Sequence, residues 1–513
     1  MKAEERKSAK DLYKQLRGLS WHTLWSGEVA RFDASSPEER KKRVAVIRAV
    51  GVVFAESGPA EEKTRVQEWL LGLSQDPCEQ VRRYAMAAMP KIGAGANEER
   101  KLLSALRTTT EEREKKFLVR TLGKIGGSAA LEQGFLGDAE QKVKASIARR
   151  ESPSAVRITG VPADFPELRI HLRGRAGLER IVSDEVEQSQ REHGKFRVTE
   201  VHSGRVTIVP MAPFLLGEIY AMRCFGTAGF VLGRTEGATE TESIEALATV
   251  ITSSLARRLF QAFTEGSIRY RLNFVSKGHQ RAAVARLANR VYARCPEILN
   301  DARRVTWTVD IYPDGRGHLV ELRPNMTPDP RFSYRQKDIP AASHPPLAAC
   351  LARLAGRIGN EVIWDPFCGS GLELIESAML GGVRSVHGTD RSAEAVAIAQ
   401  ENFAAAKAES VPAKFICGDF RDIASGQGLG TGTVTLIITN PPMGMRVPVA
   451  DLRQLIQDLF RIAATVLKPG GRLVFVNPLS METPHPLLKR QFQQKVDMGG
   501  FECRMEKYLR VNQ

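Results

Sequence analysis

Strand-like and helix-like segments alternate through residues 347–513, and this alternation constrains the possible fold more than any other feature of the chain. Strands that alternate with helices form parallel βαβ units. In such a sheet, ligands bind at the carboxyl ends of the strands. Residues that follow these strands are therefore candidates for a site. The expected strands are 361–364, 385–390, 414–419, 435–440 and 471–478, and the expected helices are 372–380, 392–406 and 451–467.

The first of these strands runs into a glycine-rich turn, Asp365-Pro-Phe-Cys-Gly-Ser-Gly371, which opens a helix. Glycines let a ligand approach the backbone closely, and a helix N-terminus offers unpaired N–H groups. The turn differs from the nicotinamide fingerprint GxGxxG, because Leu374 stands where the third glycine would be. A carboxylate beside the turn repels a pyrophosphate and suits an ammonium group. We therefore expect S-adenosylmethionine as the cofactor.

Two more acids follow the next two strands, at Asp390 and Asp419. The first can accept hydrogen bonds from both ribose hydroxyls, and the second can accept one from an adenine amino group. A lone acid at a strand end usually caps a helix or a turn, but three such acids in order favour a cofactor site. The expected cofactor-binding residues are Asp365, Phe367, Gly369, Ser370, Gly371, Asp390, Arg391, Asp419, Phe420 and Asn440.

The fourth strand ends in Asn440-Pro-Pro-Met443. The Asn440 side-chain oxygen and the Pro441 carbonyl can both accept hydrogen bonds from an exocyclic NH₂ group. Amino groups on nucleobases are poor nucleophiles because their lone pair is delocalised into the ring. Fixing the geometry and polarising the N–H bonds is therefore the expected catalytic contribution. The candidate catalytic residues are Asn440, Pro441, Pro442 and Met443, and no His/Cys cluster indicates a metal.

On these residues the chain resembles the class I S-adenosylmethionine-dependent methyltransferases. More narrowly, it resembles the THUMP-containing guanosine N2-methyltransferases that act on RNA. The turn from Asp365 to Gly371 closely matches the Asp-Pro-Phe-Cys-Gly-Ser-Gly-Thr motif of that family, with Leu372 in place of the threonine. Met443 stands where the family has a tyrosine or phenylalanine that stacks on a flipped base, and methionine packs on such a face more weakly.

The resemblance covers roughly residues 165–510 and implies methyl transfer to an exocyclic amine of an RNA base. Guanine N2 in transfer RNA is expected first, with ribosomal RNA as another substrate. An enzymatic alternative is methylation of adenine N6 or of a protein glutamine. A non-enzymatic alternative is an RNA-binding or scaffold protein with a degenerate methyltransferase site, which Met443 favours.

Upstream of residue 347, the pattern of strand-like and helix-like segments changes. Residues 160–325 mix strand-like and helix-like segments, and by resemblance they correspond to a THUMP-like α+β RNA-binding module. Six prolines between 323 and 346 indicate an extended linker at 326–346. Expected strands are 168–173, 206–209 and 306–311, and expected helices are 243–262 and 278–293.

Residues 1–150 are expected to be all helical. Their apolar residues recur at three- and four-residue spacing. The segment 76–95 is similar in sequence to 110–128, and the Lys-Ile-Gly runs near their ends lie 33 residues apart. A helical repeat of this length is typical of an α-solenoid and resembles HEAT repeats. The whole chain is therefore predicted to be multidomain: a HEAT-like solenoid at 1–150, a THUMP-like module, and a Rossmann-like class I methyltransferase at 347–513.

The net charge of +15 favours a polyanionic partner, either nucleic acid or an anionic membrane. No apolar run is long enough to span a bilayer, and the polar first residues are unlike a signal peptide. Seven widely spaced cysteines indicate a reducing compartment. We therefore expect a cytoplasmic protein whose partner is RNA, with transfer RNA first, and no membrane partner.

A base inside folded RNA must be extruded before it enters a pocket, so separate modules are expected to bind the phosphates. Residues 251–300 carry nine basic and two acidic residues, for which a solvated helix face is the alternative. The basic and aromatic residues of the linker 326–346 could hold two domains together instead of binding RNA. A HEAT-like array commonly binds protein, but a charge of +8 on residues 1–150 leaves RNA binding open. The expected RNA-binding residues are Arg257, Arg258, Arg269, Arg271, Lys277, Arg281, Arg331, Tyr334 and Arg335.

Overall fold

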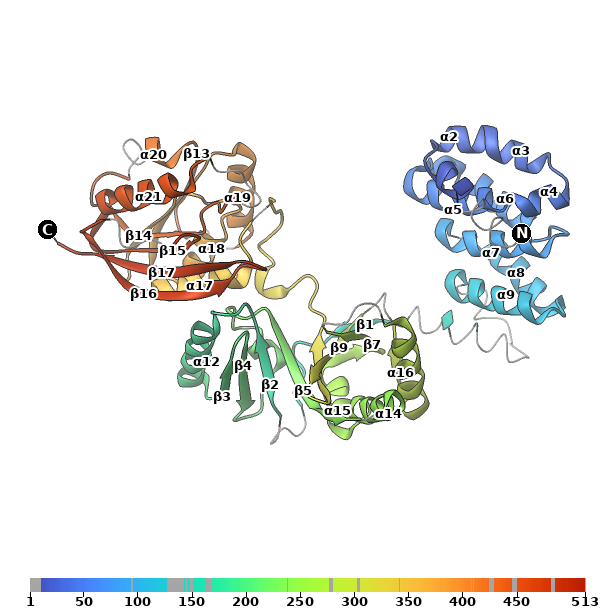
Figure 1. Ribbon diagram of the computed structural model, residues 1–513, viewed down its shortest axis with the longest axis horizontal. Helices are drawn as coiled ribbons and strands as arrows, with labels where there is room; N and C mark the ends of the chain where they lie inside the picture. The colour runs from blue at the N-terminus through green and yellow to red at the C-terminus, as the bar shows by residue number, and fades with distance from the viewer. Residues whose placement is uncertain are drawn as a thin grey trace. The chain divides into compact units, whose positions relative to one another are not determined.

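The computed structural model divides into two compact units, Met1–Pro153 and Ser154–Gln513 (Figure 1). Each unit is described by itself. No helix in the described part of the chain is both long and apolar enough to cross a membrane. The structure describes residues 11–93, 96–126, 143, 146–147, 152–162, 168–237, 239–275, 280–301, 305–340, 342–406, 408, 410–423, 429–444, 450–480 and 485–512.

The first unit is helical throughout its described residues, as the sequence predicts. Helices α7 and α9 begin and end 33 residues apart, which is the spacing of the Lys-Ile-Gly runs, and Gly93 and Gly126 follow them. Their apolar faces share one core with the preceding helices. Assignment to the HEAT type stays a prediction. The helices are α2 (Trp21–Thr23), the π-helical turn η1 (Leu24–Val29), α3 (Ala30–Asp33), α4 (Pro37–Lys42), α5 (Ala45–Ser57), the 3₁₀ turn η2 (Ala60–Glu62), α6 (Lys63–Leu73), α7 (Glu79–Ile92), α8 (Ala96–Thr108) and α9 (Glu112–Ile125).

The second unit contains an eight-stranded sheet of order β3-β4-β2-β5-β10-β9-β7-β8 and a two-stranded pair, β1-β6. The eight-stranded sheet is antiparallel except where β7 pairs in parallel with β8 and β9. The strands are β1 (Ser154–Val156), β2 (Ile170–Arg173), β3 (Phe196–His202), β4 (Arg205–Pro210), β5 (Thr227–Glu236), β6 (Thr264–Gly266), β7 (Ile268–Phe274), β8 (Ile298–Asn300), β9 (Trp307–Asp314) and β10 (Gly317–Pro324).

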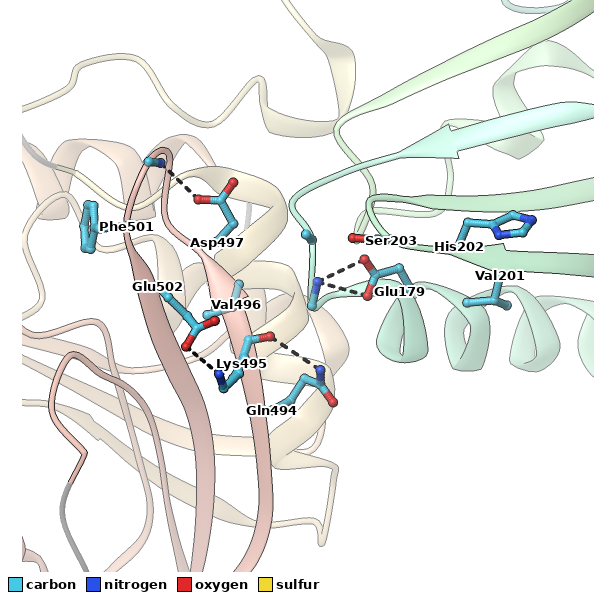
Figure 2. A pocket seen from close by; sticks show the side chains of 13 residues that line it. Glu179, Val201, His202, Ser203, Gln494, Lys495, Val496, Asp497, Phe501 and Glu502 are labelled. Carbon is cyan, nitrogen blue, oxygen red and sulfur yellow. Dashed lines mark hydrogen bonds and ion pairs between the residues drawn. The ribbon is translucent and has the colours of Figure 1, made fainter. Parts of the chain in front are cut away.

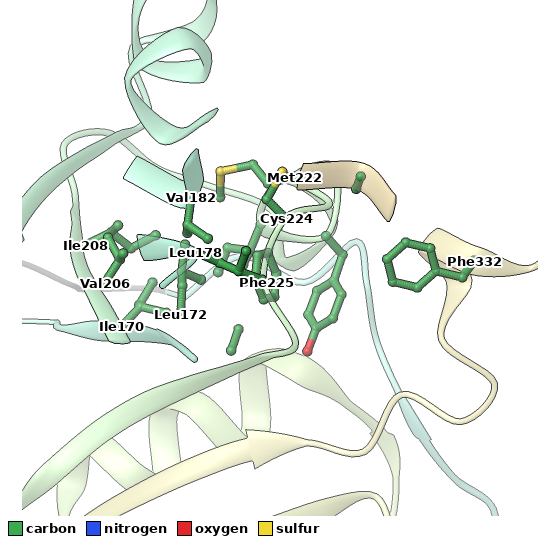
Figure 3. Close-up of a cluster of buried hydrophobic side chains, with 14 of the residues drawn as sticks. Ile170, Leu172, Leu178, Val182, Val206, Ile208, Met222, Cys224, Phe225 and Phe332 are labelled. Carbon is green, nitrogen blue, oxygen red and sulfur yellow. The ribbon is translucent and has the colours of Figure 1, made fainter. Parts of the chain in front are cut away.

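Five helices accompany these strands. The expected helix 243–262 is divided in two, because the backbone of Ser253 is extended and its side chain caps the next helix by accepting from the Ala256 N–H at 3.2 Å. Figure 3 shows part of the core of this region, in which side chains from β2, β4 and the helix that begins at Glu179 pack near Phe225. The helices are α12 (Glu179–His193), α13 (Leu216–Ile219), α14 (Glu240–Ile251), α15 (Ser254–Phe263) and α16 (Arg281–Arg294).

A seven-stranded sheet of order β13-β12-β11-β14-β15-β17-β16 occupies the C-terminal part. Its first five strands are parallel, as the sequence predicts, and β17 runs antiparallel to both of its neighbours. The final hairpin was not predicted from the sequence. The strands are β11 (Glu361–Asp365), β12 (Val383–Asp390), β13 (Ala413–Cys417), β14 (Val434–Thr439), β15 (Leu467–Asn477), β16 (Leu488–Asp497) and β17 (Glu502–Arg510).

Helices cover both faces of this sheet. Leu436 and Ile438 of β14 belong to one apolar cluster with α17, α18 and α19, whereas Ile437 belongs to another with α21. Burial on both faces explains why the parallel strands read as nearly continuous apolar runs. The helices are α17 (Pro345–Ala355), α18 (Leu372–Leu380), α19 (Ala393–Ala405), α20 (Phe420–Ile423) and α21 (Leu452–Val466).

The connector between the two large sheets is a buried strap, and two of its residues correct our RNA-binding predictions. The short 3₁₀ turn η3 (Pro330–Phe332) places Arg331 with its guanidinium 4.2 Å from the Phe225 ring centroid, donating to the Phe225 carbonyl at 2.8 Å. Tyr334 is buried and donates to Glu376 at 2.6 Å. Both predictions of RNA contact are wrong, because these side chains lie inside the unit. The interdomain strap was the right interpretation.

Candidate active site

The carboxyl ends of four parallel strands bring the predicted cofactor residues to one edge of the sheet. β11 lies between β12 and β14, so the chain leaves the centre of the sheet in opposite directions. A crevice forms at such a switch point, outside the strand ends. Asp365 ends β11, Asp390 ends β12, and Asn440 directly follows β14.

The glycine turn is shaped by two left-handed residues, Gly369 with φ 51° and Gly371 with φ 85°. A Cβ on Gly371 would lie 3.2 Å from the Ala399 Cβ of α19, so the close helix packing excludes a side chain there. Asp390 holds the turn, because one carboxylate oxygen accepts from the Gly369 N–H at 3.0 Å and the other from the Ser392 N–H at 2.9 Å. The predicted ribose acceptor therefore also orders the turn.

Asp365 is fully buried below this turn. One of its carboxylate oxygens accepts from the Phe367 N–H at 3.0 Å, and the other makes no hydrogen bond of standard geometry with a described residue. Burial raises the pKa of Asp365 well above its usual range, and the nearby Glu373 carboxylate raises it further. The Thr439 hydroxyl is nevertheless close enough to lower the pKa of this carboxyl. The Ser370 hydroxyl is also buried without a described partner. These buried polar atoms beside the turn include an acceptor that suits a cationic group.

Asn440 is held in one orientation by a chain of side chains that we did not predict. Its amide nitrogen donates to the Ser343 hydroxyl at 2.9 Å, and that hydroxyl donates to the carboxylate of Glu373. Because Ser343 gives its single hydrogen to Glu373, it must accept from the amide nitrogen. The side-chain oxygen of Asn440 is left buried and without a described hydrogen-bond partner. A buried acceptor without a donor is unfavourable, so a bound ligand is expected to supply the N–H or O–H group.

Glu373 itself is buried in the first turn of α18, and burial raises its pKa to about 7. The Ser343 hydrogen bond opposes that rise. Sequence reasoning missed both residues. Glu373 was placed in a predicted helix with no role, and Ser343 lies in the connector, where no local pattern marks it.

The other predicted site residues lie around this centre. Both carboxylate oxygens of Asp419 accept from Arg421, from its N–H at 2.9 Å and its guanidinium at 3.0 Å. The Phe367 ring packs on buried Phe420, with ring centroids 4.8 Å apart, so Phe367 supports the turn. Four predicted site residues remain. Pro441 is buried, Pro442 is half-buried and Arg391 is exposed. The sulfur of Met443 lies 3.7 Å from the sulfur of Cys503 on β17.

The predicted RNA-binding arginines are divided by the structure. Arg269 is buried and forms an ion pair with Asp301 at 3.3 Å, so its prediction as an RNA contact is wrong. The adjacent Tyr270 is buried as well, so this part of β7 is covered on both faces. Arg335 is half-buried and pairs with Asp338. Lys277 lies outside the described residues. The exposed predicted residues are Arg257 and Arg258 on α15, Arg271 on β7 and Arg281 at the start of α16.

The later arginines of α16 support the alternative interpretation, in which part of the basic segment 251–300 is a solvated helix face. Arg290 and Arg294 both pair with Glu245 of α14, at 2.6 and 2.8 Å, and Arg286 pairs with Glu240. These three arginines are balanced by acids of the neighbouring helix.

A cavity of about 640 Å³ lies elsewhere, between the loop before α12, the β3–β4 turn and the β16–β17 hairpin (Figure 2). Its charged residues are paired: Lys495 contacts Glu502 at 3.0 Å, and Asp497 accepts from the Gly499 N–H at 2.8 Å. Both oxygens of Glu179 accept from the Gly177 N–H. The cavity includes none of the predicted site residues.

Residues 333–507 match the family model described as UPF0020: RMKL-like, methyltransferase domain. A tRNA (guanine(10)-N2)-dimethyltransferase of Methanothermobacter thermautotrophicus is 29% identical over 185 residues, which are 36% of this chain and 49% of that protein. Ribosomal RNA large subunit methyltransferase G of Streptomyces griseus is 29% identical over 150 residues, 29% of this chain and 37% of that protein. The chain thus spans half or less of the curated relatives it matches.

Solved structures show the fold over a longer range. TrmN from Thermus thermophilus superimposes with a TM-score of 0.52 at 20% identity, covering 67% of this chain and 100% of that chain. A protein designated SMU.472, solved in complex with SAH, superimposes with a TM-score of 0.51 at 15% identity, covering 67% of this chain and 99% of that chain. Their coverage exceeds the region of the family match, so the likeness extends to an additional part of the fold.

Proposed function

We propose that this protein, whose residues 333–507 form a methyltransferase domain, methylates an exocyclic amino group of an RNA base. Guanine N2 in transfer RNA is the proposed target. The observation that carries the proposal is a pair of buried acceptors at the switch point that make no hydrogen bond of standard geometry with a described residue, one on Asp365 and the other on Asn440. The first fits a cationic cofactor, and the second fits an N–H donor on the substrate.

S-adenosylmethionine is the cofactor of the methyltransferase domain. It supplies an electrophilic methyl group on a sulfonium. The residues present fit it: the unpaired oxygen of Asp365 is an acceptor for the ammonium group, and the Ser370 hydroxyl adds a second polar group there. Gly369 and Gly371 keep the backbone free of side chains, and Asp390 retains lone pairs for ribose hydroxyls.

Asn440 would act by positioning and polarising the amine. Ser343 fixes the amide so that its oxygen faces away from Ser343 and is free to accept from the substrate NH₂. A hydrogen bond from one N–H to this oxygen increases the electron density on nitrogen and directs its lone pair. With the cofactor bound, its methyl group would be transferred to the nitrogen that Asn440 holds. That nitrogen then releases one proton to water and becomes a secondary amine.

The choice of substrate rests on the relatives and on the Asn440-Pro-Pro run. A tRNA guanine-N2 methyltransferase and a ribosomal RNA methyltransferase are the curated proteins described above, and both act on RNA by name. We further propose that residues 160–325 serve as a THUMP-like RNA-binding module. Exposed Arg257 and Arg258 on α15 are its first candidate contacts with phosphates.

The test is incorporation of labelled methyl groups into separate pools of transfer RNA, ribosomal RNA, DNA and protein. After digestion of the RNA, we expect label in N2-methylguanosine from the transfer RNA pool. Label in N6-methyladenine or in protein glutamine would replace the proposed substrate with one of the alternatives.

A second candidate is an RNA-binding protein without transferase activity, which Met443 in place of the expected aromatic favours. Calorimetry with S-adenosylmethionine separates the two. Binding that Asp365→Asn abolishes supports the enzyme, whereas absence of binding to the wild type supports the scaffold.

A further inference from the structure

The helical unit 1–153 contains a basic groove on the side formed by α5, α7 and α9. The groove has a volume of about 320 Å³. That volume lies at the lower end of the range for sites that hold small organic ligands. Four exposed cations and two aromatic rings contribute to its lining: Arg48, Lys91, Arg120, Lys124, Tyr84 and Phe117.

The helical repeat generates this groove. Tyr84 and Phe117 are 33 residues apart, as are Lys91 and Lys124, so consecutive repeats present an aromatic residue and a lysine at equivalent positions. Chemistry repeated along a solenoid suits a ligand that is itself a repeating chain.

The wall between the two repeats is fixed by a specific hydrogen bond. Pro90 lies inside α7 and has no N–H for the carbonyl of Met86, four residues earlier. The Thr121 hydroxyl of α9 donates to that carbonyl at 3.0 Å, in a buried position. The spacing of α7 and α9, and with it the shape of the groove, is thereby set without an acid in the lining.

The charged side chains among the described residues that line the groove are all cations. No carboxylate belongs to the described lining residues. Glu56 is the acid among the charges that act on Lys91, and it pairs with Arg17 at 3.0 Å. Burial lowers the pKa of Lys91, and the positive charges of Arg48, Arg17 and Lys124 lower it further, while Glu56 opposes them. A bound anion would relieve this repulsion.

We propose that this groove binds a single-stranded segment of RNA, with its cations contacting phosphates and the half-buried Tyr84 ring available to a base. The Phe117 ring already has a cationic neighbour, because the Arg83 guanidinium lies 5.3 Å from its centroid. Basic side chains interleaved with aromatic faces are the recurring solution for single-stranded nucleic acid, since any base can stack and every nucleotide carries a phosphate. An acidic peptide would satisfy the cations but would leave the Tyr84 ring unused. The inference rests on the proposed function for the identity of the polymer.

The test measures binding of the full chain to a fluorescein-labelled single-stranded RNA of mixed sequence, without S-adenosylmethionine. The double variant Lys91→Glu/Lys124→Glu should raise Kd by about 30-fold or more and reduce the salt dependence of binding, because two phosphate contacts are lost and two repulsive charges are introduced. Lys42→Glu/Lys101→Glu makes the same change in net charge at exposed lysines outside the groove. This control should change Kd less than about two-fold.

Two further variants separate charge from stacking. Lys91→Arg/Lys124→Arg should retain binding, and Tyr84→Leu should weaken it about five-fold without changing the salt dependence. Equal loss in the groove and control doubles would overturn the proposal, as would absence of RNA binding by the wild type. Competition by polyglutamate as strong as that by unlabelled RNA would also overturn it, in favour of an acidic protein partner.

The outcome is independent of the methyl-transfer assay. If the groove variants lose RNA binding while label enters only protein, the groove stands and the proposed function fails. If RNA is methylated but the groove variants bind like the control, the groove proposal fails alone.

Discussion

The active-site edge of the seven-stranded sheet and the basic groove of the helical unit hold their polar groups in opposite ways. At the sheet edge, the important atoms are buried and single, and they make no hydrogen bond of standard geometry with a described residue: one oxygen of Asp365 and one of Asn440. In the groove, the cations are exposed and occur at repeat-equivalent positions such as Lys91 and Lys124.

This difference has an energetic meaning. A buried acceptor without a donor costs free energy in the unbound protein and recovers it only when the right ligand arrives, so each atom matters greatly. An exposed cation is already solvated, and each one adds only a modest screened attraction. Substitutions at the sheet edge should therefore act singly and strongly, whereas those in the groove should act weakly and add together.

The largest expected effect is that of Asn440→Ala. The variant loses the acceptor that orients the amine, so we expect kcat to fall about 1,000-fold, as when a single transition-state hydrogen bond is removed. Affinity for S-adenosylmethionine should stay within about three-fold, because Asp365 and the glycine turn are unchanged. Single-turnover methylation and calorimetry measure the two quantities. Substantial activity in this variant would refute the proposed role.

Asp365→Asn should weaken S-adenosylmethionine binding about 100-fold, because it removes a buried carboxylate opposite the ammonium group. The unbound variant should be as stable as the wild type or more so, since a buried acid near Glu373 has been neutralised. Calorimetry and thermal unfolding without cofactor test this pair of expectations. Lower stability together with unchanged binding would show that Asp365 is only structural.

The pKa of Glu373 predicts how cofactor affinity depends on pH. Below about pH 7 this buried acid is protonated, and the pKa of its neighbour Asp365 is also raised. An ammonium ligand favours the ionised forms, so binding releases protons and Kd should fall about ten-fold from pH 6 to pH 8. In the unbound protein, stability should fall as pH rises from the ordinary glutamate pKa toward 7, because the unfolded chain ionises first.

Calorimetry in buffers of different ionisation enthalpy would count the released protons. Glu373→Gln should shift the affinity curve to lower pH, because the neighbouring negative charge is gone. A Kd that does not change between pH 6 and pH 8 would contradict the assignment.

Ser343→Ala tests the positioning chain with a smaller effect. Without the hydroxyl, the Asn440 amide is free to rotate, so we expect kcat to fall about ten-fold with little change in KM. Ser343→Thr keeps the hydroxyl and should retain most activity. A loss expressed only in KM would place Ser343 in substrate binding instead.

The parallel sheet and its turn could be predicted from sequence because their signals are local. The helix 372–380 coincides with α18, and Asp365, Asp390 and Asn440 all fall at strand ends. The hydrogen bond from Ser343 to Glu373 joins the connector to α18, and no sequence pattern in either segment predicts this contact. Long-range contacts of this kind depend on packing, as does the burial of Arg269 and Arg331, which charge alone had suggested were exposed.

The smallest expected effect is that of a single groove substitution, and it is the most direct measure of the contrast between the two regions. Lys91→Ala should raise the Kd for single-stranded RNA about three-fold, and Lys91→Ala/Lys124→Ala about ten-fold, because separate phosphate contacts contribute nearly independently. Each substitution should also reduce the slope of log Kd against log salt by a similar step. Titrations at three salt concentrations resolve both quantities. A single substitution that abolished binding would mean that the groove, like the sheet edge, depends on one buried contact, and the two regions would no longer differ in principle.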